Sequence, residues 1–191
     1  MPKGKLEPII QYWDSGLFIN YLMDDGDDPN PKSRVFLRLI SDAESGLIRV
    51  ALSYVVLAEV RPKRRNKASD KKIEQLLESD RPFLQWFPVT RAIAARARRI
   101  GAAYSLETAD ALHIATAIEA KAAVVFTYDG DHADKKDDGL LAMNGKIADP
   151  SLPGHAHVKI EIPSYDDGEM FGRQTYKTLE KGKKPTVESK A

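Results

Sequence analysis

Two kinds of apolar pattern alternate along the chain. Short runs made almost wholly of apolar residues predict buried strands, and longer stretches with apolar residues three and four positions apart predict amphipathic helices. Strands that alternate with helices predict an α/β fold with a central, mainly parallel sheet and helices on both faces. The runs that predict strands are residues 8–13, 47–52, 83–89 and 122–126, with 158–162 compatible with an edge strand. The helical pattern begins just past residue 14 and recurs at 32–45, 54–60, 70–79, 91–104 and 108–121.

Length and composition predict one folded domain with polar ends. A chain of 191 residues with 42% hydrophobic content can form one sizeable core. We expect this domain to span residues 8–165, preceded by a polar N-terminal arm at residues 1–7. Residues 166–191 are polar and rich in lysine, so we expect a flexible C-terminal tail there.

Composition also excludes several kinds of chemistry. The chain has no cysteine, which excludes disulfides, zinc–thiolate sites and cysteine nucleophiles. It has no signal-peptide pattern and no apolar run near the roughly 18 residues of a membrane helix, so we expect a cytoplasmic protein. The net charge of +1 does not indicate a nucleic-acid partner, which must be inferred from local patches.

Four acidic residues stand where the apolar pattern predicts something else. Asp14 and Asp129 each follow a predicted strand, and the carboxyl ends of parallel strands form the ligand crevice of an open sheet. Glu59 lies within the apolar helical stretch YVVLAEV, and Asp110 lies at the head of the apolar helix TADALHIATAIEA. An ionised carboxylate among apolar groups is costly unless it is paired or bound to a cation, so the set indicates a metal site.

Each acid taken alone has an ordinary structural explanation. Asp14 and Asp129 could form turns or cap helices, and Asp110 could simply start its helix, where the helix dipole favours an acid. Glu59 could pair with Arg61 or a nearby lysine. The functional interpretation therefore rests on the four residues as a set.

The four acids and their local sequences resemble the PIN domain, and most closely the VapC-type toxins of toxin–antitoxin pairs. The segments that carry this resemblance are YWDSGLFINYL, LSYVVLAEV, ETADALHIATA and VVFTYDGD, which together span roughly residues 9–132. The resemblance implies a PIN-like α/β/α sandwich. His132 departs from the family pattern, which has an aromatic residue after the last Asp.

The resemblance also implies roles for individual residues. Asp14, Glu59, Asp110 and Asp129 would be the catalytic, metal-binding acids, with Asp131 as an auxiliary metal ligand. The hydroxyls of Ser15 and Thr127 could orient a carboxylate or a water, although turn capping is the slightly favoured alternative. His113, one helical turn beyond Asp110, could hydrogen-bond near the site, although a structural role is the favoured alternative.

The function implied is a Mg²⁺- or Mn²⁺-dependent endoribonuclease. Two divalent ions can activate a water and stabilise the charge that develops on a phosphodiester, and such hard cations prefer carboxylate oxygens. The toxin resemblance implies an antitoxin partner and a homodimer. One alternative is a catalytically inactive PIN-like module that binds RNA or a protein partner. Another is a phosphatase that uses Asp129 or Asp14 as its nucleophile.

Two basic patches could hold RNA beside an acidic site. Residues 61–72 contain seven basic residues against one acid, and residues 91–99 contain four arginines. Such patches bind phosphate with a salt-dependent affinity, although a solvated helix face is the alternative. The residues predicted to bind RNA are Lys63, Arg64, Arg65, Arg96 and Arg99.

Overall fold

The computed structural model describes residues 7–24, 30–61, 67–131, 139–148 and 157–164. The strands are β1 (Ile9–Trp13), β2 (Ile48–Ser53), β3 (Leu84–Phe87), β4 (Val124–Phe126) and β5 (Ile160–Glu161). The helices are α1 (Ser15–Leu22), α2 (Pro31–Glu44), α3 (Tyr54–Glu59), α4 (Lys67–Glu78), α5 (Arg91–Tyr104) and α6 (Thr108–Glu119), together with the 3-10 helix η1 (Leu140–Met143).

The five strands form one sheet in the order β3-β2-β1-β4-β5, and every pairing is parallel. The predicted parallel sheet is therefore confirmed. The first three strands in the chain are added towards one edge and the last two towards the other, so the order reverses between β1 and β4. In open α/β sheets, ligands bind outside the carboxyl ends of the strands at such a reversal.

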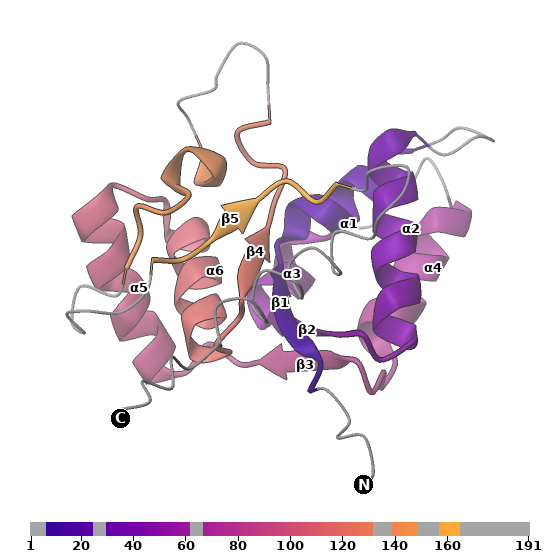
Figure 1. Cartoon of the computed structure of the whole chain (residues 1–191), viewed down its shortest axis with the longest axis horizontal. Helices are drawn as coiled ribbons and strands as arrows, with labels where there is room; N and C mark the ends of the chain where they lie inside the picture. Colours follow the sequence, from indigo (N-terminus) through magenta and orange to yellow (C-terminus); the bar gives the residue numbers. More distant parts are fainter. Residues whose placement is uncertain (1–6, 25–29, 62–66, 132–138, 149–156, 165–191) are drawn as a thin grey trace, which may run out of the picture.

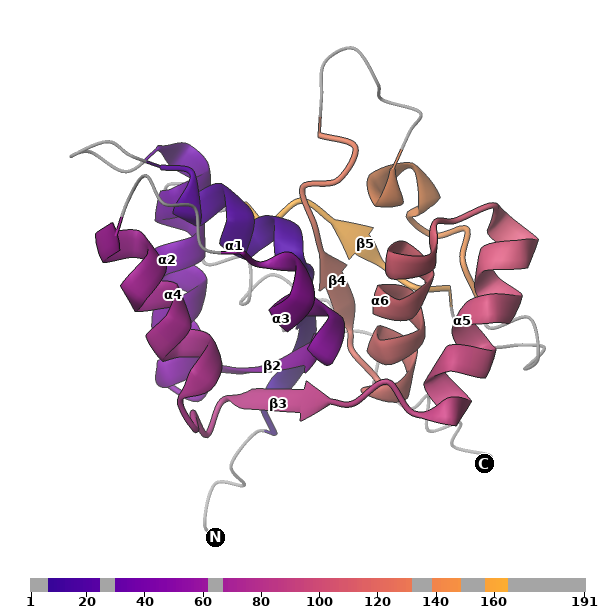
Figure 2. The ribbon, with the colours of Figure 1, turned by 180° about the vertical axis from the view of Figure 1, so that it is seen from behind.

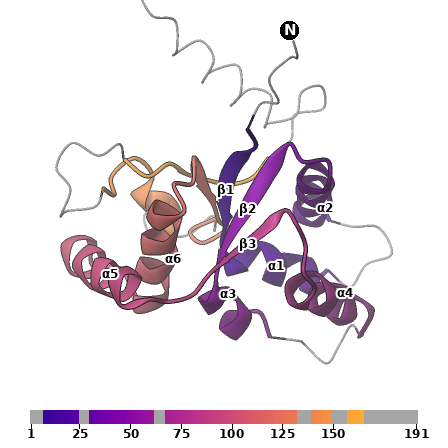
Figure 3. The ribbon, with the colours of Figure 1, turned by 90° about the horizontal axis from the view of Figure 1, so that it is seen from below.

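Successive residues of the central strands face opposite sides of the sheet, which gives the fold three layers. Trp13 packs into a core cluster with residues of α1, α2 and α4, and its neighbour Tyr12 packs into a second cluster with residues of α5 and α6. Figure 3 shows these two helical layers on either side of the sheet. The predicted α/β/α sandwich is confirmed, with both faces of the sheet covered (Figure 1).

Helix α3 has a separate place at the carboxyl end of β2. Ser53 accepts a hydrogen bond from the backbone N–H of Val55 and so caps this short helix, as the sequence predicts. Seen from behind, α3 lies between α4 and α6 (Figure 2), and it contacts α6. This position carries Glu59, the last residue of α3, towards the helix that bears His113.

The elements match the sequence pattern closely, with one addition. α5 has the predicted bounds, whereas α4 begins three residues earlier than the predicted helix 70–79. The helix η1 is not predicted from the sequence, and Leu140 and Ile147 around it are fully buried. The predicted N-terminal arm, apart from residue 7, and the predicted C-terminal tail lie outside the described residues. Within the described ranges, no helix combines the length and apolar character needed to cross a membrane.

The packing of α6 against the sheet generates a stability prediction. Ile114 is fully buried in the cluster formed with α5, so Ile114→Ala should lower the free energy of unfolding by about 2–5 kcal/mol. The matched control is Leu37→Ala, because Leu37 is 42% exposed on α2 and its truncation should cost well under about 1 kcal/mol. Urea unfolding of both variants measures the difference, and equal losses would contradict this packing.

Candidate active site

Asp14 is the central residue of the candidate site. Its backbone N–H donates to the carbonyl of Phe126 at 3.0 Å, which continues the pairing of β1 with β4. The residue is only 6% exposed. Its Oδ1 accepts from the Ser15 backbone N–H at 2.7 Å, and its Oδ2 accepts from the Thr127 hydroxyl at 2.8 Å. Hydrogen bonds therefore hold both oxygens of this carboxylate in place.

The two hydroxyl residues predicted beside the site both contact this carboxylate. Thr127 is fully buried; its hydroxyl donates to Asp14 and accepts from the backbone N–H of Asp129 at 2.9 Å. It thus orients a carboxylate and shapes a turn at the same time. Ser15 makes a longer hydroxyl contact of 3.4 Å with Asp14 Oδ1. Thr127 therefore fits both predicted alternatives, because it orients a carboxylate and caps a turn. Ser15 contacts the same carboxylate.

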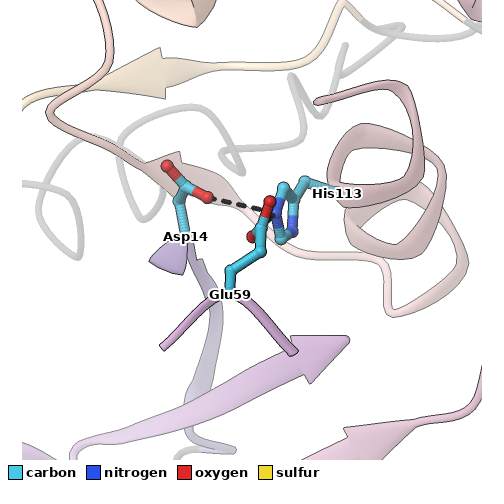
Figure 4. Close-up of side chains that lie close together, drawn as sticks. All are labelled: Asp14, Glu59 and His113. Carbon is cyan, nitrogen blue, oxygen red and sulfur yellow. Dashed lines mark hydrogen bonds and ion pairs between the residues drawn. The ribbon is translucent and has the colours of Figure 1, made fainter. Parts of the chain in front are cut away.

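Glu59 and Asp14 meet at the imidazole of His113 (Figure 4). The Nε2 atom of His113 lies 2.8 Å from Glu59 Oε2 and 3.3 Å from Asp14 Oδ1. His113 is 1% exposed, whereas the Glu59 side chain is 31% exposed. The structure therefore brings together two acids predicted for the site, one buried and one reaching towards solvent.

These three residues form a compact group of ligand-type atoms. Within the described part of the chain, Asp14, Glu59 and His113 are the set whose carboxylate and imidazole atoms all lie within 4.8 Å of one another. The sequence predicts that His113 could hydrogen-bond near the site, with a structural role as the favoured alternative. Its position on α6, one turn beyond Asp110 and on the same helix face, is the observation that favours the role in the site.

The contact between His113 and Glu59 shifts the pKa values of both. The hydrogen bond from His113 lowers the pKa of Glu59 and outweighs the opposing effect of partial burial. Burial by itself would lower the pKa of His113. The hydrogen bond to Glu59 and the negative charges of Asp14, Glu59 and Asp110 outweigh burial and raise it. Glu59 thus stays ionised, next to a buried imidazole that its carboxylate stabilises.

Asp110 interacts electrostatically with the other acids of the site. It lies half-buried in the first turn of α6. Burial is the largest cause that raises its pKa to about 6, followed by the negative charges of Asp129 and Asp14. Asp129 and Asp14 are thus close enough to Asp110 for their charges to oppose its ionisation.

Asp129 accepts a hydrogen bond from a backbone group that lies 11 residues further along the chain. The backbone N–H of Leu140 donates to its Oδ2 at 2.7 Å, which links η1 to the end of β4. Gly139 precedes this contact with φ of +84°, and a Cβ there would lie 2.6 Å from the same oxygen. Only glycine fits this position, because any side chain would displace the Asp129 carboxylate.

Asp131 has a different environment from the other predicted ligands. Its Oδ2 pairs with Lys32 Nζ of α2 at 2.8 Å, and the same ammonium lies 4.6 Å from the centre of the Tyr128 ring. Burial and the negative charge of Asp131 raise the pKa of Tyr128 to about 12. A cationic partner already neutralises Asp131, so its auxiliary metal role stays a prediction and has no support from these contacts.

The predicted RNA-binding residues fall into two groups. Lys63, Arg64 and Arg65 lie outside the described residues. Arg96 donates to Glu119 at 2.6 Å, so it links α5 to α6, and Arg99 is exposed on α5. The first patch therefore stays a prediction, and Arg96 has a structural contact that the sequence pattern did not indicate.

The donor set suits a hard divalent cation. Asp14, Glu59, Asp110 and Asp129 offer carboxylate oxygens, the ligands that Mg²⁺ and Mn²⁺ prefer. Burial and then the negative charges of Asp129 and Asp14 raise the pKa of Asp110, and a bound cation would oppose both effects. These residues therefore fit a metal ion, and the site gains most from one when all four acids are ionised.

The environment of Asp110 generates a pH prediction for the metal-free protein. A carboxyl group whose pKa is raised by folding favours the folded state when protonated, and this contribution is lost as the pH rises through about 6. Asp110→Asn should therefore stabilise the protein at about pH 8, on the order of 1 kcal/mol after allowance for solvent screening, and have little effect near pH 4. Urea unfolding in EDTA measures this, with exposed Asp80→Asn as the control. A pH-independent effect of Asp110→Asn would contradict the prediction.

Comparison with known proteins agrees with this architecture. Residues 12–138, more than half of the chain, match the PIN domain family. No curated protein matches the sequence. Among solved structures, a toxin–antitoxin complex from Klebsiella pneumoniae has 18% identity and a TM-score of 0.46, covering 63% of this chain and 87% of that one. VapBC2 from Rickettsia felis, bound to a promoter DNA fragment, has 15% identity and a TM-score of 0.46, covering 66% and 93%. Since the family match covers more than half of the chain and includes all four acids, the chain belongs to the PIN domain family.

Proposed function

We propose that this protein is a Mg²⁺- or Mn²⁺-dependent endoribonuclease. The observation that carries the proposal is the contact of two predicted acids, Asp14 and Glu59, with one histidine that also lies within the electrostatic reach of Asp110. Asp14 and Glu59 share one imidazole, and Asp14 and Asp129 both act on the pKa of Asp110. Such a concentration of acids is unfavourable without a cation, and hydrolysis of a phosphodiester is a reaction that carboxylate-bound cations support.

Each acid has a distinct part in this proposal. A bound Mg²⁺ or Mn²⁺ would polarise the phosphoryl group and supply a water that is easier to deprotonate. Asp14 is the rigid ligand, because hydrogen bonds hold both of its oxygens. Asp110, whose pKa is raised to about 6, would bind the cation in its ionised form, since a metal ion and a proton compete for the same oxygen. Glu59 is the most solvent-facing member of the His113 group and stays ionised, which suits a ligand at the mouth of the site.

A role as the toxin of a toxin–antitoxin pair follows from the motif resemblance. On that basis we propose an antitoxin protein that covers the acidic site, and a homodimer. Induced expression in bacterial cells should arrest growth for the wild type and not for Asp14→Asn at equal protein levels. Growth that continues under both would remove the toxin role and leave the nuclease proposal to be tested in vitro.

The contacts of Asp131 bear on the phosphatase alternative. A phosphatase built on Asp129 and Asp131 would need both carboxylates at the reacting phosphate, whereas Asp131 is paired with Lys32. Glu59 would also have no part in that chemistry. The inactive-module alternative is opposed by the presence of all four acids, and the following cleavage experiment separates it from the nuclease.

Substitution of Asp14 tests the metal site and the activity together. Asp14→Asn should lower Mn²⁺-dependent cleavage of a single-stranded RNA by at least about 100-fold. Mn²⁺ at about 100 times its Kd should raise the Tm of the wild type by about 5–10 °C and leave that of the variant unchanged. Asp80→Asn, at an exposed aspartate outside the site, should behave as the wild type. Equal cleavage by wild type and Asp14→Asn would reject the nuclease assignment.

The predicted basic patch generates a separate binding test. Lys63→Ala with Arg64→Ala should weaken RNA binding and lower the slope of log K against log salt by about 0.7 for each lost phosphate contact. Arg38→Ala with Lys146→Ala removes the same charge from other parts of the surface and serves as the control. Fluorescence anisotropy in EDTA measures binding without cleavage. Identical slopes for the two double variants would remove this patch from the proposal.

A further inference from the structure

A buried chain of hydrogen bonds runs from Tyr12 through His113 to Glu59. The Tyr12 hydroxyl lies 2.6 Å from His113 Nδ1, and the opposite ring nitrogen, Nε2, lies 2.8 Å from Glu59 Oε2. Tyr12 is fully buried and His113 is nearly so. Tyr12 is not among the residues that the sequence predicts for the site, and nothing in the acid motif requires a tyrosine at this position.

The contacts decide which nitrogen of His113 carries a hydrogen. Two carboxylate oxygens lie 2.8 and 3.3 Å from Nε2, and carboxylates can only accept. A bare Nε2 lone pair would be repelled by both, so Nε2 carries a hydrogen. At the other end, the Tyr12 hydroxyl lies 2.6 Å from Nδ1, and in the neutral ring with its hydrogen on Nε2 this nitrogen accepts the Tyr12 hydrogen.

We propose that His113 is a positioning residue for Glu59 and does not bind the cation itself. Its Nε2–H holds the Glu59 carboxylate beside Asp14, and the Tyr12 hydroxyl holds the imidazole in the tautomer that can do so. The inference rests on the proposed function, because the purpose of this arrangement is to place Glu59 at the metal. It assigns functions to two residues outside the set of four acids.

The alternative is that His113 is a fourth ligand through Nε2. That role requires Nε2 to lose its hydrogen and Nδ1 to carry one. Tyr12 would then have to turn its own hydrogen away from Nδ1 and accept from this nitrogen at 2.6 Å. Hard cations also prefer the carboxylate oxygens of Asp14, Asp110 and Asp129 to an imidazole nitrogen. Both arguments favour the positioning role.

Three variants separate the two roles. His113→Gln keeps an amide N–H where Nε2–H stands, His113→Leu removes the donor at similar volume, and Tyr12→Phe removes only the hydroxyl that fixes the tautomer. Isothermal titration with MnCl₂ measures affinity in each variant. Circular dichroism and urea unfolding in EDTA confirm that the compared variants are folded.

The positioning role predicts a graded loss of Mn²⁺ affinity. His113→Leu should lose about 10–100-fold, which is typical for residues that orient metal ligands. Tyr12→Phe should lose less, and His113→Gln should stay within about threefold of the wild type because it restores the donor. Wild-type affinity in folded His113→Leu would overturn the proposal, and so would equal losses in His113→Gln and His113→Leu.

Two spectroscopic measurements complete the test. Imidazole ¹⁵N NMR of the metal-free protein should place the His113 hydrogen on Nε2 in the wild type, and a hydrogen on Nδ1 alone would overturn the proposal. Pulsed EPR of the Mn²⁺ complex should lack the coupling of a directly bound ¹⁴N, and such a coupling that disappears in His113→Gln would establish His113 as a ligand. If Nε2–H is observed but the wild type neither binds Mn²⁺ nor cleaves RNA, the proposed function fails while the hydrogen-bond assignment is supported.

Discussion

The parallel pairing of β1 with β4 is the constraint on which the candidate site depends. It sets Trp13 opposite Phe126, so the residues that follow, Asp14 and Thr127, emerge side by side at the edge of the sheet. The Asp14 N–H continues the ladder by one more hydrogen bond, and Thr127 then binds the Asp14 carboxylate. A slip of one residue in this register would exchange core and site positions on both strands. The hydrophobic core and the placement of the acids are thus determined by the same backbone pairing.

The site contains unfavourable electrostatic interactions, and the packing of the rest of the fold offsets their energy. Asp110 is held near two other acids at the head of a helix that is otherwise apolar and buried. Buried clusters on both faces of the sheet keep α6 and β1 in place despite this repulsion. His113 eases part of it by contacting two of the acids. A cation bound at the site would offset this repulsion and so couple occupancy of the site to the stability of the whole domain.

The fold, and the position of Asp14 and Asp129 just after strands, could be predicted because both follow from local patterns. A short apolar run that ends in Asp14 or Asp129 identifies a strand end, and the alternation of strands and helices implies that such ends share an edge. The contacts between segments could not be predicted in this way. That Glu59 meets His113 depends on how α3 packs against α6, and that Lys32 pairs with Asp131 depends on where α2 begins. The hydrophobic periodicity along the chain does not predict either of these two contacts.

Gly139 and Leu140 bring the chain back to the carboxylate that it left at the end of β4. The Leu140 N–H anchors Asp129 through a backbone group that lies 11 residues further along the chain. Because a Cβ at position 139 would displace this carboxylate, a substitution at a residue that carries neither charge nor side chain would change where negative charge lies in the site.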